Sequence, residues 1–211
     1  MRVHPFVGPL CAVLLLAGCA RSREVVAPSV EDHATDNWHE LATDDDRARI
    51  RHWRDSWVEA LAQARAADAS AVSGEGALLD PDAGERGAPL PAGDYRCRTI
   101  KLGVLGAPHP AFRVEPAGQC RVVAEGGRLH FFRLDGAQRP IGILFADGTR
   151  RTIFLGTLQL GDEALALRYG RDRERDMAGL VEKIGDGRWR LVLPAPHFES
   201  LLDVIELIPA R

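Results

Sequence analysis

The feature that most constrains the fold is a change of hydrophobic period at the Pro- and Gly-rich stretch PDAGERGAPLPAG, residues 81–93. After it, short runs alternate apolar and polar side chains. In RWRLVLP, for example, Trp189, Leu191 and Leu193 share one face and Arg190 lies on the other. A period of two is typical of half-buried β-strands. The stretch itself has the composition of a linker or a long loop.

Ten short runs after this stretch are predicted to be strands. They are residues 94–102, 111–116, 119–124, 128–134, 140–145, 151–160, 164–169, 179–184, 188–193 and 203–208. Turn dipeptides such as Asp135-Gly136 and Asp186-Gly187 separate many of them, and Asp-Gly between extended runs is a strong hairpin signal. Short strands at about ten-residue spacing indicate a barrel or a sandwich. We therefore expect a mainly β protein with an N-terminal α-helical segment, its β part a small antiparallel meander barrel, closed or nearly closed, or a sandwich.

Before the linker the period is that of a helix. Residues 43–67 place an apolar residue at every third or fourth position, and these form one stripe: Ile50, Trp53, Trp57, Leu61 and Ala64. Thr43 is a candidate N-cap, with Asp46 three residues later. We expect a helix over 43–67 that packs on the β region, with an exposed docking face as the alternative. A shorter helix around 36–41 would add Trp38 to this cluster.

The first residues carry the pattern of an export signal. The apolar run 6–18 is too short for a membrane span, which needs about 20 apolar residues, and it fits a signal peptide. Its end, Leu-Ala-Gly-Cys at 16–19, resembles a bacterial lipobox. The resemblance implies cleavage before Cys19 and acylation of its thiol. Ala20, in place of Asp, implies an outer-membrane destination. An ordinary signal peptide with an incidental Cys is the alternative.

With a lipidated Cys19 the chain divides into four parts. These are a signal peptide (1–18), a lipidated tether (19–35), a helical segment with the Pro/Gly-rich linker (36–92) and a β-barrel-like domain (93–211). Two or more acyl chains would hold the protein to the periplasmic face of the outer membrane, so the membrane is an expected partner. Loss of Arg2 with the signal changes the formal net charge from −3 to −4, which argues against a nucleic-acid partner.

Cysteine usage predicts one disulfide bond. Cys11 would leave with the signal and Cys19 would carry lipid, so Cys97 and Cys120 remain. Two thiols in an oxidising compartment favour a disulfide. A zinc site is the rival, but such sites usually need four ligands at tight spacing such as CxxC, which the sequence lacks. We therefore expect a Cys97–Cys120 disulfide and no metal.

The sequence carries no strong catalytic signature. It has no GxSxG, HExxH or P-loop motif. The segment PHFESLLD holds His197, Glu199, Ser200 and Asp203 and suggests a hydrolase using His197 and Ser200. A nucleophile also needs a base within reach and an oxyanion hole, which residues so close in sequence rarely supply. The sequence therefore favours a non-enzymatic protein without a cofactor, and a hydrolase is the alternative.

The segment GRDRERD at 170–176 alternates basic and acidic side chains. Such a run usually forms salt bridges with itself on a solvated loop. Its length also suits a large loop at a barrel mouth, where Arg171, Arg173 or Arg175 would contact an anionic ligand. These three residues are therefore candidate ligand contacts.

Several blocks together resemble an uncharacterised family of secreted Gram-negative proteins, domain of unknown function 4893. They are RHWRDSWVEALAQARA (51–66), EGALLDPDA (75–83), GDYRCRTIKLG (93–103), GRDRERDMAG (170–179) and RWRLVLPAPHFESLLDVIELIP (188–209). The resemblance covers roughly residues 36–209. It implies no particular activity, so no catalytic residue is transferred with it.

The function expected from the sequence is that of an outer-membrane-anchored periplasmic lipoprotein with a binding or envelope-associated role. Its barrel would hold a small apolar or amphipathic ligand, or its surface would dock an envelope protein. A protease-inhibitor-like barrel and a purely structural protein are further alternatives. A cavity inside the barrel would support ligand binding. A barrel filled by Phe131, Leu155, Leu167 and Trp189 would favour the docking or structural alternatives.

Overall fold

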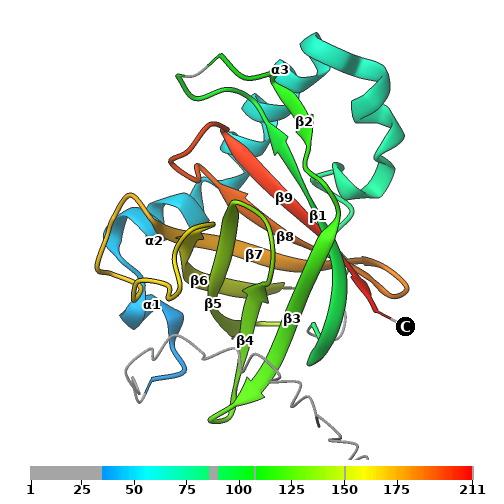
Figure 1. The fold of residues 1–211 in the computed structure, drawn as a ribbon. Helices are drawn as coiled ribbons and strands as arrows, with labels where there is room; N and C mark the ends of the chain where they lie inside the picture. Colours follow the sequence, from blue (N-terminus) through cyan, green and yellow to red (C-terminus); the bar gives the residue numbers. More distant parts are fainter. Residues whose placement is uncertain (1–34, 86–89, 107, 150, 211) are drawn as a thin grey trace, which may run out of the picture.

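The structure is a computed structural model that describes residues 35–85, 90–106, 108–149 and 151–210 (Figure 1). The predicted signal peptide (1–18), the lipidation of Cys19 and all but the last residue of the tether lie outside the described residues. None of the described helices has both the length and the apolar character that a bilayer span requires.

The β region is a closed antiparallel barrel. Its strands are β1 (Gly93–Leu102), β2 (Phe112–Val114), β3 (Gly118–Glu125), β4 (Arg128–Arg133), β5 (Gln138–Asp147), β6 (Arg151–Leu160), β7 (Asp176–Gly185), β8 (Arg188–Pro194) and β9 (Leu202–Pro209). Strands β3 to β9 pair in chain order, and β1 pairs with both β3 and β9 and so closes the ring of eight strands. The short strand β2 pairs only with the end of β1. The predicted meander barrel is confirmed, and the sandwich alternative is wrong.

Alternating side chains of these strands fill the barrel. The inward-facing apolar cluster includes Phe131, Phe154 and Leu191, all fully buried, and Trp189. Of the four predicted filling residues, Phe131 and Trp189 are therefore correct. Leu155 is wrong because it lies one residue out of phase with Phe154 and packs outside the barrel, under the helices.

The predicted strand 164–169 is also wrong. This segment belongs to the loop that joins β6 to β7, and β6 pairs directly with β7 from Thr152 to Thr157. A closed barrel has no free edge at which the segment could add a strand. Its alternating residues Leu165 and Leu167 are instead exposed, so Leu167 is not a barrel-filling residue either.

Two glycines let strands β5 and β6 approach closely. Gly142 pairs with Gly156, and the ring of Phe154 lies over both. Phe154 in turn meets Phe131 edge to face at 5.9 Å. A glycine in a strand often marks such a close approach. The pair therefore makes room for the aromatic centre of the barrel.

Gly156→Ala is expected to lower the free energy of unfolding by about 1–3 kcal/mol, the usual cost of overpacking a core. An added Cβ would lie 2.2 Å from the carbonyl oxygen of Ile141 and 2.5 Å from the Phe154 ring. Urea denaturation followed by circular dichroism measures the change. Gly74→Ala is the matched control, because a Cβ there meets no atom within 4 Å. An equal loss in both variants would contradict this prediction.

Helices cover part of the outside of the barrel (Figure 1). They are α1 (Trp38–Leu41), α2 (Asp44–Arg51) and α3 (Trp53–Gly74), followed by the 3-10 turn η1 (Gly76–Leu78). α2 contacts β7, and α3 contacts β1, β2, β8 and β9. The predicted apolar stripe packs on the barrel together with Trp38, so the packing interpretation of the helix is confirmed.

The predicted continuous helix over 43–67 needs correction. It begins as expected, since the Thr43 side chain accepts a hydrogen bond from the backbone N–H of Asp46. It breaks at His52, whose backbone is not helical, and α3 then continues to Gly74 with a kink at Asp68. The Asp68 side chain accepts from the N–H of Ala71 and so caps the second part. The break lets the two helices follow different faces of the round barrel.

Cys97 of β1 and Cys120 of β3 form the predicted disulfide bond. Both cysteines face the barrel interior and are buried. In the ladder between these two strands, the first pair is Gly93 with Val122 and the last pair is Cys97 with Gly118. Cys97 therefore lies where this ladder ends.

Candidate ligand-binding site

A cavity of about 520 Å³ opens at one end of the barrel. The ends of β1, β4, β5, β6, β7 and β9 form its walls. Its rim is formed by β2, by the segments that precede β3 and β5, and by the loop between β8 and β9. Its lining residues are Thr99, Lys101, Arg113, Glu115, Pro116, Ala117, Arg133, Asp135, Gly136, Ala137, Gln138, Pro140, Leu158, Met177, Glu199, Asp203 and Ile205. Those on the barrel strands continue the inward-facing alternation, so the cavity is the mouth of the barrel interior.

One wall of the cavity is apolar. Leu158, Met177 and Ile205 are buried members of the inward-facing cluster and also line the cavity. The remaining lining is largely polar or charged. A cavity with both kinds of wall suits a ligand with an apolar part and a polar part.

Lys101 is the central polar residue of the site. Its side chain is 6% exposed, and Nζ donates to Oε1 of Gln138 at 2.8 Å and to Oδ2 of Asp203 at 3.0 Å. Oε2 of Glu199 lies 3.8 Å from the same nitrogen. The Ser200 hydroxyl donates to the other oxygen of Asp203 at 2.5 Å. A buried ammonium group is stable only with such partners.

Arg133 is a second buried cation in the wall. Its guanidinium donates to Oγ1 of Thr99 at 2.7 Å and to the backbone carbonyl of Asp135 at 3.1 Å. Its nearest carboxylate oxygen, Oδ1 of Asp135, lies 3.7 Å away. Burial lowers the pKa of Arg133, although the carboxylates of Asp135 and Glu115 oppose this effect.

Arg113 and Glu199 form an ion pair at the rim. Arg113 also donates from Nε to Oε1 of Glu115 at 2.7 Å. Burial alone would raise the pKa of Glu199, but the hydrogen bond from Arg113 and the charge of Lys101 outweigh it, so the pKa is lowered. Glu199 is therefore ionised at neutral pH.

Glu199 lies on an unusual loop between β8 and β9. Ala195, His197 and Glu199 have φ values of 46°, 59° and 68°, in the left-handed region that non-glycine residues rarely adopt. The N–H of Phe198 donates to the carbonyl of Pro196, and the N–H of Ser200 donates to that of Phe198. These are two consecutive γ-turns of the rare positive-φ form. Strained backbone of this kind is concentrated at functional sites.

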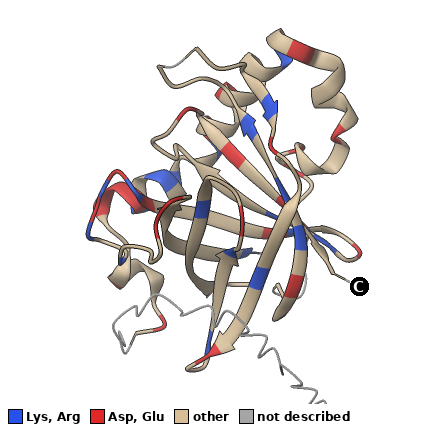
Figure 2. Ribbon diagram, viewed as in Figure 1, with Lys and Arg blue, Asp and Glu red and all other residues tan. Residues whose placement is uncertain are grey.

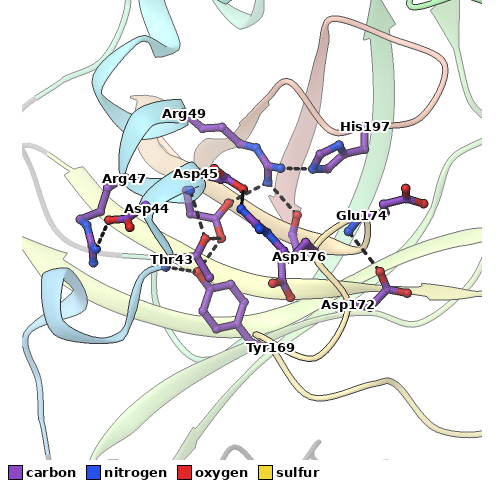
Figure 3. Close-up of polar contacts among 12 residues, drawn as sticks. Thr43, Asp44, Asp45, Arg47, Arg49, Tyr169, Asp172, Glu174, Asp176 and His197 are labelled. Atoms are coloured by element: carbon purple, nitrogen blue, oxygen red, sulfur yellow. Dashed lines mark hydrogen bonds and ion pairs between the residues drawn. The ribbon is translucent and has the colours of Figure 1, made fainter.

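The structure does not bring His197 and Ser200 together as a catalytic pair. The Ser200 hydroxyl donates to Asp203 and to the carbonyl of Phe198. The His197 ring is turned toward Arg49 of α2 (Figure 3). Burial and the charge of Arg49 lower the pKa of His197. Within the described part of the chain, no hydrogen bond joins the His197 ring to Ser200, so the geometry does not support the hydrolase alternative.

Arg171, Arg173 and Arg175 lie on the loop that joins β6 to β7, at the same end of the barrel as the cavity. They do not line the cavity. Arg173 pairs with Asp45 of α2, and Arg175 pairs with Glu163 of its own loop. Figure 2 shows charges of both signs on this loop and on α2 beside it. Two of the three arginines therefore hold the loop in place.

A cluster of polar side chains connects α2 to this loop and to β7 through hydrogen bonds (Figure 3). The fully buried Asp46 accepts from the Tyr169 hydroxyl at 2.5 Å and from Arg49 at 2.7 Å. Arg49 also donates to the backbone carbonyl of Asp176 at 2.7 Å. Burial raises the pKa of Asp176 to about 6. The network fixes the position of α2 on the barrel.

The described residues contain no group of three or more His, Cys, Asp or Glu side chains arranged to hold a metal ion. The cavity's own donors are instead charged and amide side chains that bind one another. Their chemistry suits recognition of a polar ligand group by hydrogen bonds and charge.

Sequence reasoning named Glu199 and Asp203 only as part of a hydrolase hypothesis and missed Lys101 and Arg133. The alternation of side chains along a strand could have identified such residues. Lys101 lies in phase with Cys97 of the same strand, which faces the interior. A charged residue at an inward-facing strand position indicates a polar cavity, because a lysine is rarely buried without a partner.

No curated protein and no solved structure matches the chain. The model of one family, described as Domain of unknown function (DUF4893), matches residues 38–207. The match begins at α1 and includes the barrel to Leu207 of β9. Because it covers most of the sequence, the chain belongs to the DUF4893 family.

Proposed function

We propose that the protein is a non-enzymatic, outer-membrane-anchored lipoprotein of the periplasm that binds a small amphipathic ligand in the mouth of its barrel. The single observation that carries the binding role is the cavity of about 520 Å³ with one apolar wall and a charged rim. This volume is within the range of about 300–1,000 Å³ common for small-molecule sites. The lipobox-like sequence before Cys19 supports the anchor.

The structure of the walls supports a ligand with two chemical parts. Leu158, Met177 and Ile205 offer buried apolar surface to its hydrocarbon part. Lys101 and Gln138 offer polar groups to its head. Small barrels of about eight strands have just enough interior space for one such ligand.

Ala137→Trp is expected to abolish ligand binding. Ala137 is exposed at the rim of the cavity, so an indole there fills the entrance without disturbing the core. Native mass spectrometry of the protein purified from cell envelopes should show a bound small molecule in the wild type and none in this variant. Ala66→Trp, at an exposed site on α3, is the control and should retain the ligand.

Two results would overturn the proposal. One is a wild-type spectrum without any bound molecule. The other is a bound molecule that is retained equally in the Ala137→Trp and Ala66→Trp proteins, because the ligand would then lie outside the barrel mouth. Circular dichroism on both variants checks that the fold is unchanged.

A further inference from the structure

We propose that Glu199 occupies the place of the ligand's own head group, and that the ligand is an amphipathic carboxylate whose head displaces the Glu199 side chain from Arg113 and Lys101. This inference rests on the proposed function, because it names the chemical class of the ligand in the same cavity. It also assigns Glu199 a role in specificity.

The contacts of Glu199 define a binding site for a carboxylate. One oxygen, Oε2, accepts a hydrogen bond from Nη2 of Arg113 and lies 3.8 Å from Nζ of Lys101. Lys101 comes from β1 and Arg113 from β2, whereas Glu199 comes from the loop between β8 and β9. A carboxylate between a guanidinium and an ammonium group forms charge-assisted hydrogen bonds, which are stronger than neutral ones.

The Glu199 side chain is able to leave this position. It is 31% exposed, whereas the Lys101 side chain is only 6% exposed. The Glu199 carbonyl accepts from the N–H of Leu105 and so holds the backbone in place. Rotation of the side chain into water therefore suffices, and the backbone of the loop stays where it is.

The strained loop indicates that the position of Glu199 is specified by the fold. Two consecutive positive-φ γ-turns centred on His197 and Glu199 are unfavourable for side-chain-bearing residues. Such backbone persists only where the surrounding structure holds it. Here the N–H of Ala195 donates to the carbonyl of Leu201, and Ser200 bonds Asp203, so both flanks of the turns are fixed.

The local contacts of Arg113 and Lys101, and not the net charge of the cavity, select an anionic head. With Glu199 in place, the cavity holds three basic side chains and four carboxylates (Lys101, Arg113 and Arg133; Glu115, Asp135, Glu199 and Asp203). A ligand carboxylate that replaces Glu199 restores the same balance inside the cavity. A neutral head would leave Arg113 and Lys101 with one partner fewer, and a cationic head would be repelled by them.

Calorimetric titration with decanoate and with 1-decanol tests this proposal on the full-length folded protein. These probes share an alkyl chain and differ in head group. Decanoate is expected to bind the wild type at least tenfold more tightly than 1-decanol. In the Glu199→Gln variant the competing carboxylate is absent, so decanoate affinity should rise by roughly tenfold while 1-decanol affinity changes less than twofold.

Two further variants separate specific from general charge effects. Glu174→Gln removes the same charge from an exposed loop at the same end of the barrel and should leave decanoate affinity unchanged. Arg113→Met, at a partly exposed position, should weaken decanoate binding at least tenfold and 1-decanol binding much less.

The outcomes distinguish this inference from the proposed function. Equal affinities for decanoate and 1-decanol, or the same effect of Glu199→Gln and Glu174→Gln, would overturn the role of Glu199 and leave the cavity a binding site. Failure of decanoate to bind, while native mass spectrometry shows a neutral ligand, would do the same. If no probe binds and no ligand is found, the proposed function itself is wrong.

Discussion

Arg190→Ala is expected to lower the free energy of unfolding by about 3–5 kcal/mol, as for other buried ion pairs that lose one partner. Arg190 of β8 is fully buried. Two of its nitrogens donate to Oε2 of Glu182 at 3.0 and 2.7 Å, and its guanidinium lies 4.5 Å from the ring of Trp57. Removal of the guanidinium leaves Glu182 without its partner.

Arg190 also holds the helical segment to the barrel. Its Nη1 donates to the backbone carbonyls of Ala77, Leu78 and Asp80, at 3.1, 3.1 and 2.6 Å. These carbonyls follow α3, so one side chain joins β8, β7 and the end of the helical segment. Because a lysine has no planar fork of donors, Arg190→Lys should recover less than half of the lost stability.

Urea denaturation followed by circular dichroism measures this loss. Arg121→Ala is the control, since the Arg121–Asp94 pair on the surface should contribute no more than about 1 kcal/mol. The double variant Arg190→Met/Glu182→Gln should be more stable than Arg190→Ala, because no uncompensated charge stays buried. A loss of under 1 kcal/mol for Arg190→Ala would show that the guanidinium does not secure the helical segment.

The strand pattern could be predicted because the inward face of each barrel strand repeats with a period of two, and turn dipeptides separate many of the runs. Nine of the ten predicted strands are present, at slightly different bounds. The tenth, 164–169, also alternates apolar and polar residues, but it is a loop and its side chains have different surroundings. The Tyr169 hydroxyl donates a hydrogen bond to Asp46 of α2, whereas the side chains of Leu165 and Leu167 are exposed. Alternation alone does not say whether a neighbouring strand is available.

The helix ends were harder to predict because tertiary contacts decide them. The apolar stripe continues without interruption through His52, so the sequence gives no sign of the break between α2 and α3. The break follows from the curvature of the barrel surface and from the network that fixes α2 through Asp46 and Arg49. Closure of the barrel, which determines this curvature, depends on the pairing of β1 with β9, far apart in the sequence.

The site was only partly predictable for the same reason. The segment 197–203 was recognised as rich in functional groups, but its side chains point to different neighbours. His197 meets Arg49 of α2, Glu199 meets Arg113, and Ser200 meets Asp203. Which side chains share a cavity depends on the loop geometry. That geometry depends on two γ-turns for which no sequence rule exists.

Removal of the disulfide in a Cys97→Ala/Cys120→Ala variant is expected to lower the free energy of unfolding by about 3.4 kcal/mol. The bond closes a loop of about 24 residues. The expected loss of stability corresponds to the conformational entropy that closure of this loop removes from the unfolded chain. For a protein of this size the midpoint of thermal unfolding should fall by roughly 10 °C. Thermal unfolding of the oxidised wild type and of the variant measures the difference.

The position of the disulfide gives it a second effect. One of its cysteines, Cys97, is in the last pair of the β1–β3 ladder, opposite Gly118, and beyond this pair β1 pairs with β2 instead. Thr99 and Ala117, which flank this ladder end, line the cavity. Loss of the bond should therefore loosen the cavity wall, so ligand affinity should fall along with stability.

Wild type treated with dithiothreitol should match the double variant, and the reductant should not change the variant itself. Equal stability of oxidised and reduced wild type would contradict the prediction, and free thiols at both positions in untreated protein would contradict the disulfide. A loss of stability without any loss of affinity would show that the β1–β3 ladder holds the cavity wall unaided. The mouth of the barrel would then owe its shape to strand pairing and to Arg133, which bridges Thr99 and the carbonyl of Asp135 across this wall.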